Sequence, residues 1–428
     1  MLSLFKGVFM KREVRDNATK RYPKPVTKVE LDDKHVKLRI ILIVVFIIIA
    51  GVFIGITLSR QFGTKAGWTT IEVTYDENNN SGDFVFQYEL GTKNISLTSE
   101  KNQVSKIYTE SLIKIYQLLD EVNEYQTLKN IYYINKHINE EIEIDSVLYE
   151  SLKNLNNTRY IYQSLIFNQY SNMFYADSDS NAIKFDAYKN EEMETYFKSI
   201  LYYTNNEHHI NLELLENNKV KLNVSVEYQT FMKEIEENTF ISLEFIKNAS
   251  IIDYVSDTLI KNNFTTGNIS SYDGYTRNLD SRNMEYNMNV RDKDDIVYNA
   301  FSYTYNGPTS IVYLRNYKVN AKDESRFYEY KDGTRRTWYI DLNDGLDKAV
   351  TSNMICLSKN KTCVAILLEM LNVYVSLSID TDLINNLKLH DIYTIYINKK
   401  EIHHNFDTNI KNIYSTSTIS YEVIYDKD

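Results

Sequence analysis

The longest apolar stretch of the chain is the run IILIVVFIIIAGVFIGITL, from Ile40 to Leu58, which contains no charged residue. At 1.5 Å per residue of α-helix, this run nearly crosses a hydrocarbon layer about 30 Å thick. The following residues, GITLSRQF, offer no small-x-small cleavage site, so a removed signal peptide is not expected. The pattern therefore predicts a single uncleaved transmembrane helix over 40–58.

Beyond this run, the spacing of apolar positions predicts helices and strands in mixed order. Apolar residues at Ile107, Leu112, Ile115 and Leu118 fall on one face of a helix, which we expect over 103–134. Further helices are expected over 146–166, 362–375 and 380–389, and strands in FVFQYELGTKNISLTS, SIVYLRNYKV, RRTWYIDLNDG, NMICL and DIYTIYIN. HINLELL and KVKLNVSV, joined by ENN, predict a hairpin.

These elements predict an α+β (mixed α/β) fold in one continuous domain. The expected organisation is a basic arm (1–39), the transmembrane helix (40–58), a polar stalk (59–83) and a folded domain (84–428). The polar stretch 276–295 is the one plausible seam inside that domain.

Charge is divided unevenly along the chain. Residues 1–39 hold 11 Lys/Arg and 5 Asp/Glu, a net charge of +6, so the chain's net charge of −10 leaves −16 for the remainder. By the positive-inside rule, the arm stays in the cytoplasm and the acidic domain lies outside the cell membrane. The arm is either a topology signal or a binder of anionic lipid or a cytoplasmic partner. A domain this acidic is not expected to bind nucleic acid.

Searches for catalytic and metal motifs find little. HExxH, GxSxG, the phosphate-loop glycine pattern and a CxxC pair are all missing from the sequence. The pairs His208-His209 and His403-His404 lie in or beside predicted strands, where neighbouring side chains point to opposite faces and hardly chelate one ion. Cys356 and Cys363 either close a small disulfide loop or remain buried free thiols.

One unusual turn is FISLEFIKNASIIDYVSDTL, residues 240–259, which reads as a strand running into an amphipathic helix. Such turns often carry glycines, so that backbone N–H groups approach a phosphate at the helix N-terminus. Here Glu244 and Phe245 occupy the turn instead.

The order of segments resembles the FAD:protein FMN transferase (ApbE) family of the bacterial envelope. YELGTKNISL matches the family's opening strand, LKNIYYIN its Asn-containing helix end, and TTGNISSYDGYTRNL and YKVNAKDESRFYEYKDGTRRTWYIDLNDG its later motifs, over about residues 84–400. The resemblance implies the family fold. It makes these residues the candidates for flavin contact: Gly91, Thr92, Asn135, Asp253, Asp273, Arg326 and Asp341.

The chain departs from the family pattern where the family binds metal and pyrophosphate. Glu244-Phe245 stand for two glycines, Trp338 for a histidine, Cys363 for a metal-binding Asp and Leu367 for a Thr. The family passes FMN from FAD to a Ser/Thr hydroxyl of an acceptor protein, with a divalent ion placing the FAD pyrophosphate. Mg²⁺ prefers oxygen ligands, and a side chain at a lost glycine blocks close backbone approach. These departures leave FAD and Mg²⁺ doubtful as cofactors, and we assign no catalytic residue or metal ligand.

Three functions remain open at this stage. The first is a catalytically degenerate family member that binds a ligand or an envelope protein partner. The second is an active, divergent FMN transferase whose metal ligands lie elsewhere, with Asp253, Asp273 and Asp341 as first candidates. The third is an unrelated structural or adhesive envelope domain. Its similarity to the family would then be a coincidence of an amino-acid composition typical of AT-rich coding sequences.

Overall fold

The computed structural model describes residues 36–62, 64–75, 80–155, 158–323 and 325–426. Helix α1, Val36–Phe62, includes the apolar run 40–58 and is a unit of its own, separate from the compact unit that begins at Thr64. Among the described residues, no helix meets the combined length and hydropathy criteria for crossing a membrane. Residues 1–35 of the basic arm (1–39) lie outside the described residues, and 36–39 form the start of α1.

The second unit is built on a nine-stranded sheet in the order β1-β2-β6-β7-β10-β13-β14-β15-β17. All neighbouring strands pair antiparallel except β15 and β17, which are parallel. The strands are β1, Gly67–Thr70; β2, Phe84–Leu90; β6, Gly267–Ser271; β7, Tyr275–Asn278; β10, Thr309–Arg315; β13, Asn353–Ser358; β14, Tyr393–Asn398; β15, Glu401–His404; and β17, Glu422–Tyr425. Because β1 joins this sheet, part of the segment expected as a stalk contributes to the fold.

Three smaller sheets accompany it. They are β16-β9-β8 (Ile410–Lys411, Val297–Asn306, Glu285–Lys293), β3-β5-β4 (Glu141–Glu143, Lys219–Val224, Ile210–Leu215) and β11-β12 (Phe327–Glu329, Arg335–Thr337). The predicted hairpin is confirmed as β4 and β5, and its turn places Asn217 and Asn218 at positive φ. The polar stretch 276–295 forms most of β7 and all of β8, so the expected internal seam is wrong.

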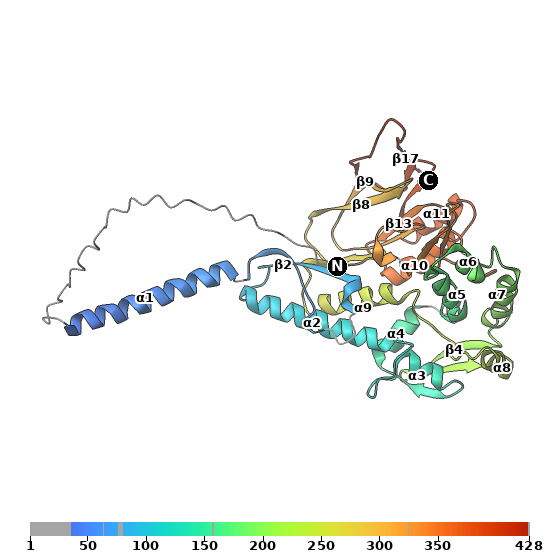
Figure 1. Cartoon of the computed structure of the whole chain (residues 1–428), viewed down its shortest axis with the longest axis horizontal. Coiled ribbons are helices and arrows are strands. Elements are labelled where there is room, and N and C mark those ends of the chain that lie inside the picture. Colours follow the sequence, from blue (N-terminus) through green and yellow to red (C-terminus); the bar gives the residue numbers. More distant parts are fainter. Residues whose placement is uncertain (1–35, 63, 76–79, 156–157, 324, 427–428) are drawn as a thin grey trace, which may run out of the picture. The chain divides into compact units, whose positions relative to one another are not determined.

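Ten helices lie in the part of this unit that the structure describes. They are α2, Leu97–Leu119; α3, Ile131–Lys136; α4, Ser146–Asn154; α5, Ser164–Phe174; α6, Asp179–Ala182; α7, Glu191–Thr204; α8, Val226–Glu234; α9, Lys247–Lys261; α10, Cys363–Tyr374; and α11, Thr381–Leu389, with short 3-10 turns at 80–83, 159–162, 183–185 and 321–323. Helices α2 and α9 run side by side, and α9 also contacts α10 (Figure 1).

The central strands are buried on both faces, so the unit has three layers. In β10, Ile311 and Tyr313 belong to a core beneath the β8–β9 hairpin, whereas Val312 and Leu314 belong to the core beneath the helices. This division follows from the period of two along a strand. It places the helices on one face and the small β16-β9-β8 sheet on the other.

Two helix predictions need correction. The helix expected over 103–134 ends at Leu119, because the Asp120 carboxylate accepts the N–H groups of Val122 and Asn123 and turns the chain; α3 then begins after Asn130. The helix expected over 146–166 is divided into α4, a 3-10 turn and α5. The helices expected over 362–375 and 380–389 are confirmed as α10 and α11.

The strand expected at 240–243 is also wrong. This segment is extended but pairs with no strand among the described residues. Its polar backbone groups bond instead to the Asn135 side chain and to the Ile161 carbonyl, which accepts the Ser242 N–H at 2.8 Å. Side-chain hydrogen bonds therefore take the place of a strand ladder.

Candidate functional site

The turn before α9 has no glycine, and the side chain of Phe245 is buried at this turn. Phe245 is 4% exposed and stacks between Tyr160 and Phe167, with ring centroids 5.3 and 5.2 Å away. Trp338 makes an edge-on contact with the same ring, with the two ring centroids 5.6 Å apart. Offset aromatic packing of this kind adds to the free energy gained by burial. Phe245 thus makes this turn part of the hydrophobic core.

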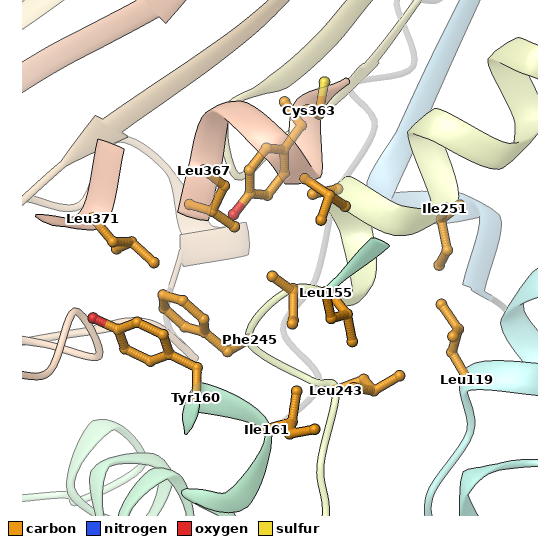
Figure 2. Close-up of a cluster of buried hydrophobic side chains, with 14 of the residues drawn as sticks. Leu119, Leu155, Tyr160, Ile161, Leu243, Phe245, Ile251, Cys363, Leu367 and Leu371 are labelled. Atoms are coloured by element: carbon orange, nitrogen blue, oxygen red, sulfur yellow. The ribbon is translucent and has the colours of Figure 1, made fainter. Parts of the chain in front are cut away.

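The N-terminal half of α10 faces the same apolar region. Cys363 and Leu367 are both 0% exposed, and Figure 2 shows Leu367, Leu371 and Phe245 in one cluster of hydrophobic side chains. The Cys363 thiol lies 3.5 Å from the Thr276 carbonyl oxygen, and burial raises its pKa well above the usual range. A thiol that stays protonated is a poor metal ligand.

Cys356 and Cys363 are both buried free thiols. Of the two alternatives for this pair, a disulfide loop or free thiols, the structure has the free thiols.

Asp253 caps helix α10 from the side of α9. Its two carboxylate oxygens accept the N–H groups of Cys363 and Val364, each at 2.9 Å, and Arg277 lies 3.5 Å away. Burial raises the pKa of Asp253 to about 6, while Arg277 and the two N–H groups lower it. The next two N–H groups of α10 bond to the side chain and the carbonyl of Thr362. The N–H groups of Cys363, Val364 and Ala365, three donors that have no partner within the helix, are therefore bonded to side chains of the protein itself.

Asp273 and Arg326 form an ion pair beside the aromatic cluster. The Arg326 Nη2 to Asp273 Oδ2 distance is 3.2 Å, and Asn248 donates to the same oxygen at 3.0 Å. The Arg326 guanidinium also lies over the Trp338 ring, 5.4 Å from its centroid. The structure therefore brings these two predicted residues together.

The remaining predicted residues have structural partners of their own. The Asn135 amide holds the extended segment at Phe240 and Ile241. The Gly91 N–H and the Thr92 hydroxyl both donate to the buried carboxylate of Glu100, and Gly91 has φ +94°.

Asp341 lies in a separate turn. Its carboxylate pairs with Lys348 at 2.6 Å and accepts the Asn343 N–H at 2.9 Å. These contacts tie it to neighbours along the chain.

Among the seven predicted residues, Asp273 and Arg326 pair directly, and Gly91 and Thr92 share the Glu100 carboxylate. Within the part of the chain that the structure describes, no group of three or more His, Cys, Asp or Glu side chains could hold a metal ion. Phe245, Cys363 and Leu367 are closely packed where the resemblance expects a flavin and its ion. The residues present therefore do not fit FAD and Mg²⁺ at this position.

Glu121 is a residue that the sequence patterns missed. It follows Asp120, the C-cap of α2, and its Oε2 accepts the Leu243 N–H at 3.1 Å, so it fixes the start of the 243–246 turn. Burial raises its pKa to about 7, and the nearby Glu244 carboxylate adds to that shift. One signal was available, because a carboxylate at the end of an apolar helical stripe is often held by backbone groups.

This carboxyl predicts a pH dependence of stability. A raised pKa means that the folded protein binds a proton more tightly than the unfolded chain, so stability is lost as pH rises through about 4.5 to about 7. We expect Glu121 to account for about 3 kcal/mol of that loss. Glu121→Gln should abolish this share, measured as the difference between the urea unfolding free energies of the two proteins at pH 5 and pH 8. Equal pH dependence in both proteins would contradict the assignment.

Comparison with known proteins supports the fold. No protein-family model matches the sequence, and no curated protein matches it. Among solved structures, the ApbE protein from Thermotoga maritima matches with a TM-score of 0.51 and 12% identity, over 78% of this chain and 94% of that chain. The flavin transferase ApbE from Vibrio cholerae, solved as a mutant, matches with a TM-score of 0.49 and 14% identity, over 81% of this chain and 98% of that one. The chain therefore has an ApbE-like fold, as the sequence resemblance predicted.

Proposed function

We propose that this protein is a membrane-anchored, extracytoplasmic member of the ApbE family that no longer transfers FMN and acts as a binding or interaction protein. The observation that carries the proposal is the packing of Phe245, which fills the turn where the family pattern has glycines. The membrane location rests on the uncharged run 40–58 and on the basic arm before it.

Three further features oppose flavin transfer. The N–H groups that begin α10 already bond to Asp253 and Thr362, so they are not available to a phosphate. Leu367 supplies no oxygen to a hard cation. Glu244, paired with Lys247 at 3.3 Å, adds negative charge beside the same turn. Each feature separately weakens the binding of a magnesium pyrophosphate.

A flavin titration tests this proposal. We expect the full-length protein, purified in detergent, to show no saturable quenching of FAD fluorescence up to about 100 µM FAD, with or without Mg²⁺. We also expect no FMN on a Ser/Thr-containing acceptor protein, with a known flavin transferase assayed in parallel. Saturable, Mg²⁺-dependent binding with FMN transfer would instead establish the second alternative, an active divergent transferase.

Restoring one family residue should not restore the metal site. In Cys363→Asp we expect no measurable heat of Mg²⁺ binding by calorimetry, because Leu367 and Glu244 remain. We also expect a loss of about 2 kcal/mol or more in unfolding free energy, since the new carboxylate is buried beside Asp253. Cys363→Ser is the control that adds a polar atom without a charge. Stoichiometric Mg²⁺ binding by Cys363→Asp would show that the lost ligands matter less than we propose.

A further inference from the structure

A second hollow lies on the opposite face of the large sheet from the closed site. It has a volume of about 700 Å³, within the usual range of ligand pockets. The ends of β9 and β13 and the starts of β8, β10 and β14 meet there, because antiparallel pairing brings these termini to one edge. The segment 406–409 completes the wall. Glu285 of β8 and residues 304–306 of β9 line the pocket. Figure 1 shows the β8–β9 hairpin to which they belong.

Aromatic rings line this pocket. Tyr305 belongs to an aromatic row along the hairpin, with Tyr286 stacked 5.7 Å away. Tyr393 and Phe406 pack against each other with centroids 5.5 Å apart. The hydroxyls of Tyr305 and Tyr393 make no hydrogen bond to any residue that the structure describes, although burial raises the pKa of Tyr305 to about 12. Both phenols can therefore donate to a ligand.

Three neutral amides, those of Asn283, Asn306 and Asn409, are among the other polar groups of the pocket. Lys359 Nζ donates to Asn306, and the Asn306 amide donates to Asn283, each at 3.1 Å, so these three exposed side chains form a hydrogen-bonded chain. Asn409 and Asp407, across the pocket, make no side-chain hydrogen bond within the described part of the chain. Amides with remaining donors and acceptors can bond to a ligand that is rich in hydroxyl groups.

The charges in the pocket disfavour an anion. Its two carboxylates, Glu285 and Asp407, outnumber its one cation, Lys359. Glu285 is paired with Lys411 at 3.1 Å, and Lys359 is held by Asn306. Phosphate recognition uses clustered Arg or Lys side chains, and none gather here among the described lining residues. A neutral ligand is therefore the better match.

We propose that this pocket binds a short, uncharged oligosaccharide. The C–H face of a sugar ring is apolar and packs on an aromatic ring, while its hydroxyls at the edge bond to amides, phenols and carboxylates. The pocket presents both kinds of surface side by side: Tyr393 and Phe406 on one wall, and Asn306, Asn409 and Asp407 around them. It is independent of the flavin question, because it lies across the sheet from Phe245.

The test is binding of neutral trisaccharides to the full-length protein. Maltotriose, cellotriose, mannotriose and chitotriose are offered at up to about 10 mM in a detergent without a sugar head group, with binding followed by saturation-transfer NMR and calorimetry. Trigalacturonate and tetra-alanine serve as the anionic and the peptide control ligand. We expect at least one neutral trisaccharide to bind and neither control ligand to bind.

Variants locate the site. We expect Tyr393→Ala to weaken binding about tenfold or more and Asn409→Ala about threefold or more. Asn409 is exposed, so its variant should fold even if Tyr393→Ala does not. Tyr175→Ala and Asn372→Ala change exposed residues of the same types elsewhere and should bind normally. The proposal is overturned if no trisaccharide binds, if tetra-alanine or trigalacturonate binds instead, or if Asn409→Ala binds like the unmodified protein.

Discussion

Phe245→Ala is expected to lower the free energy of unfolding by about 3–5 kcal/mol. The ring is 4% exposed and packs face to face with Tyr160 and Phe167, so its loss removes both buried apolar area and aromatic contacts. The rings around it belong to separate elements and cannot all collapse into the space. Urea denaturation followed by circular dichroism measures the change.

Tyr175→Ala is a suitable control, because Tyr175 is 69% exposed and its removal should cost less than about 0.5 kcal/mol. The Phe245→Ala protein also tests the proposed function. Phe245→Ala should still fail to bind FAD, since the α10 N-terminus remains capped by Asp253. A loss of unfolding free energy near that of Tyr175→Ala would mean that the turn is an open cleft, and FAD binding would mean that Phe245 alone blocks it.

Asp253→Ala has the second largest expected effect, a loss of about 3 kcal/mol at pH 7.5. The substitution leaves two buried N–H groups of α10 without an acceptor and removes one partner of Arg277. Arg277 keeps a contact with Asp257 at 2.7 Å, which limits the loss. The measurement is again the urea unfolding free energy.

Asp253→Asn provides the matched comparison. The amide keeps one carbonyl oxygen for a helix N–H but loses the negative charge, so we expect a smaller loss of about 1–2 kcal/mol. A larger loss of unfolding free energy for Asp253→Ala than for Asp253→Asn is expected if Asp253 both caps α10 and pairs with Arg277. If both variants unfold like the unmodified protein, Asp253 is not structural, and its place among possible ligands reopens.

Both expectations bear on the proposal that this protein does not bind flavin. In the family pattern, a glycine turn and a helix N-terminus leave backbone donors open to a charged ligand. Here Phe245 covers the turn, and the Asp253 carboxylate occupies the helix donors. Side chains of the protein itself therefore occupy this turn and three of the N–H groups at the start of α10.

Periodicity alone predicted a large part of the fold. The hairpin at 210–224, helices α10 and α11 and strand β14 lie where the pattern placed them. The errors occurred where a single side chain redirected the backbone: Asp120 ended a helix early, and Asn135 took the role of a strand partner for 240–241. Such hydrogen bonds reach across as many as 106 positions and leave no periodic signal.

The sequence by itself determined the apolar run at 40–58, the charge asymmetry around it, the α+β class and the presence of Phe245, Cys363 and Leu367 at positions where the resemblance implies glycine or oxygen ligands. These are properties of local order and residue type. Only the tertiary structure decided that Phe245 is stacked and buried, that Asp253 caps α10, and that a polar, aromatic pocket opens on the far face of the sheet. Burial, hydrogen bonding and pocket shape depend on which distant segments meet, and that is set by packing.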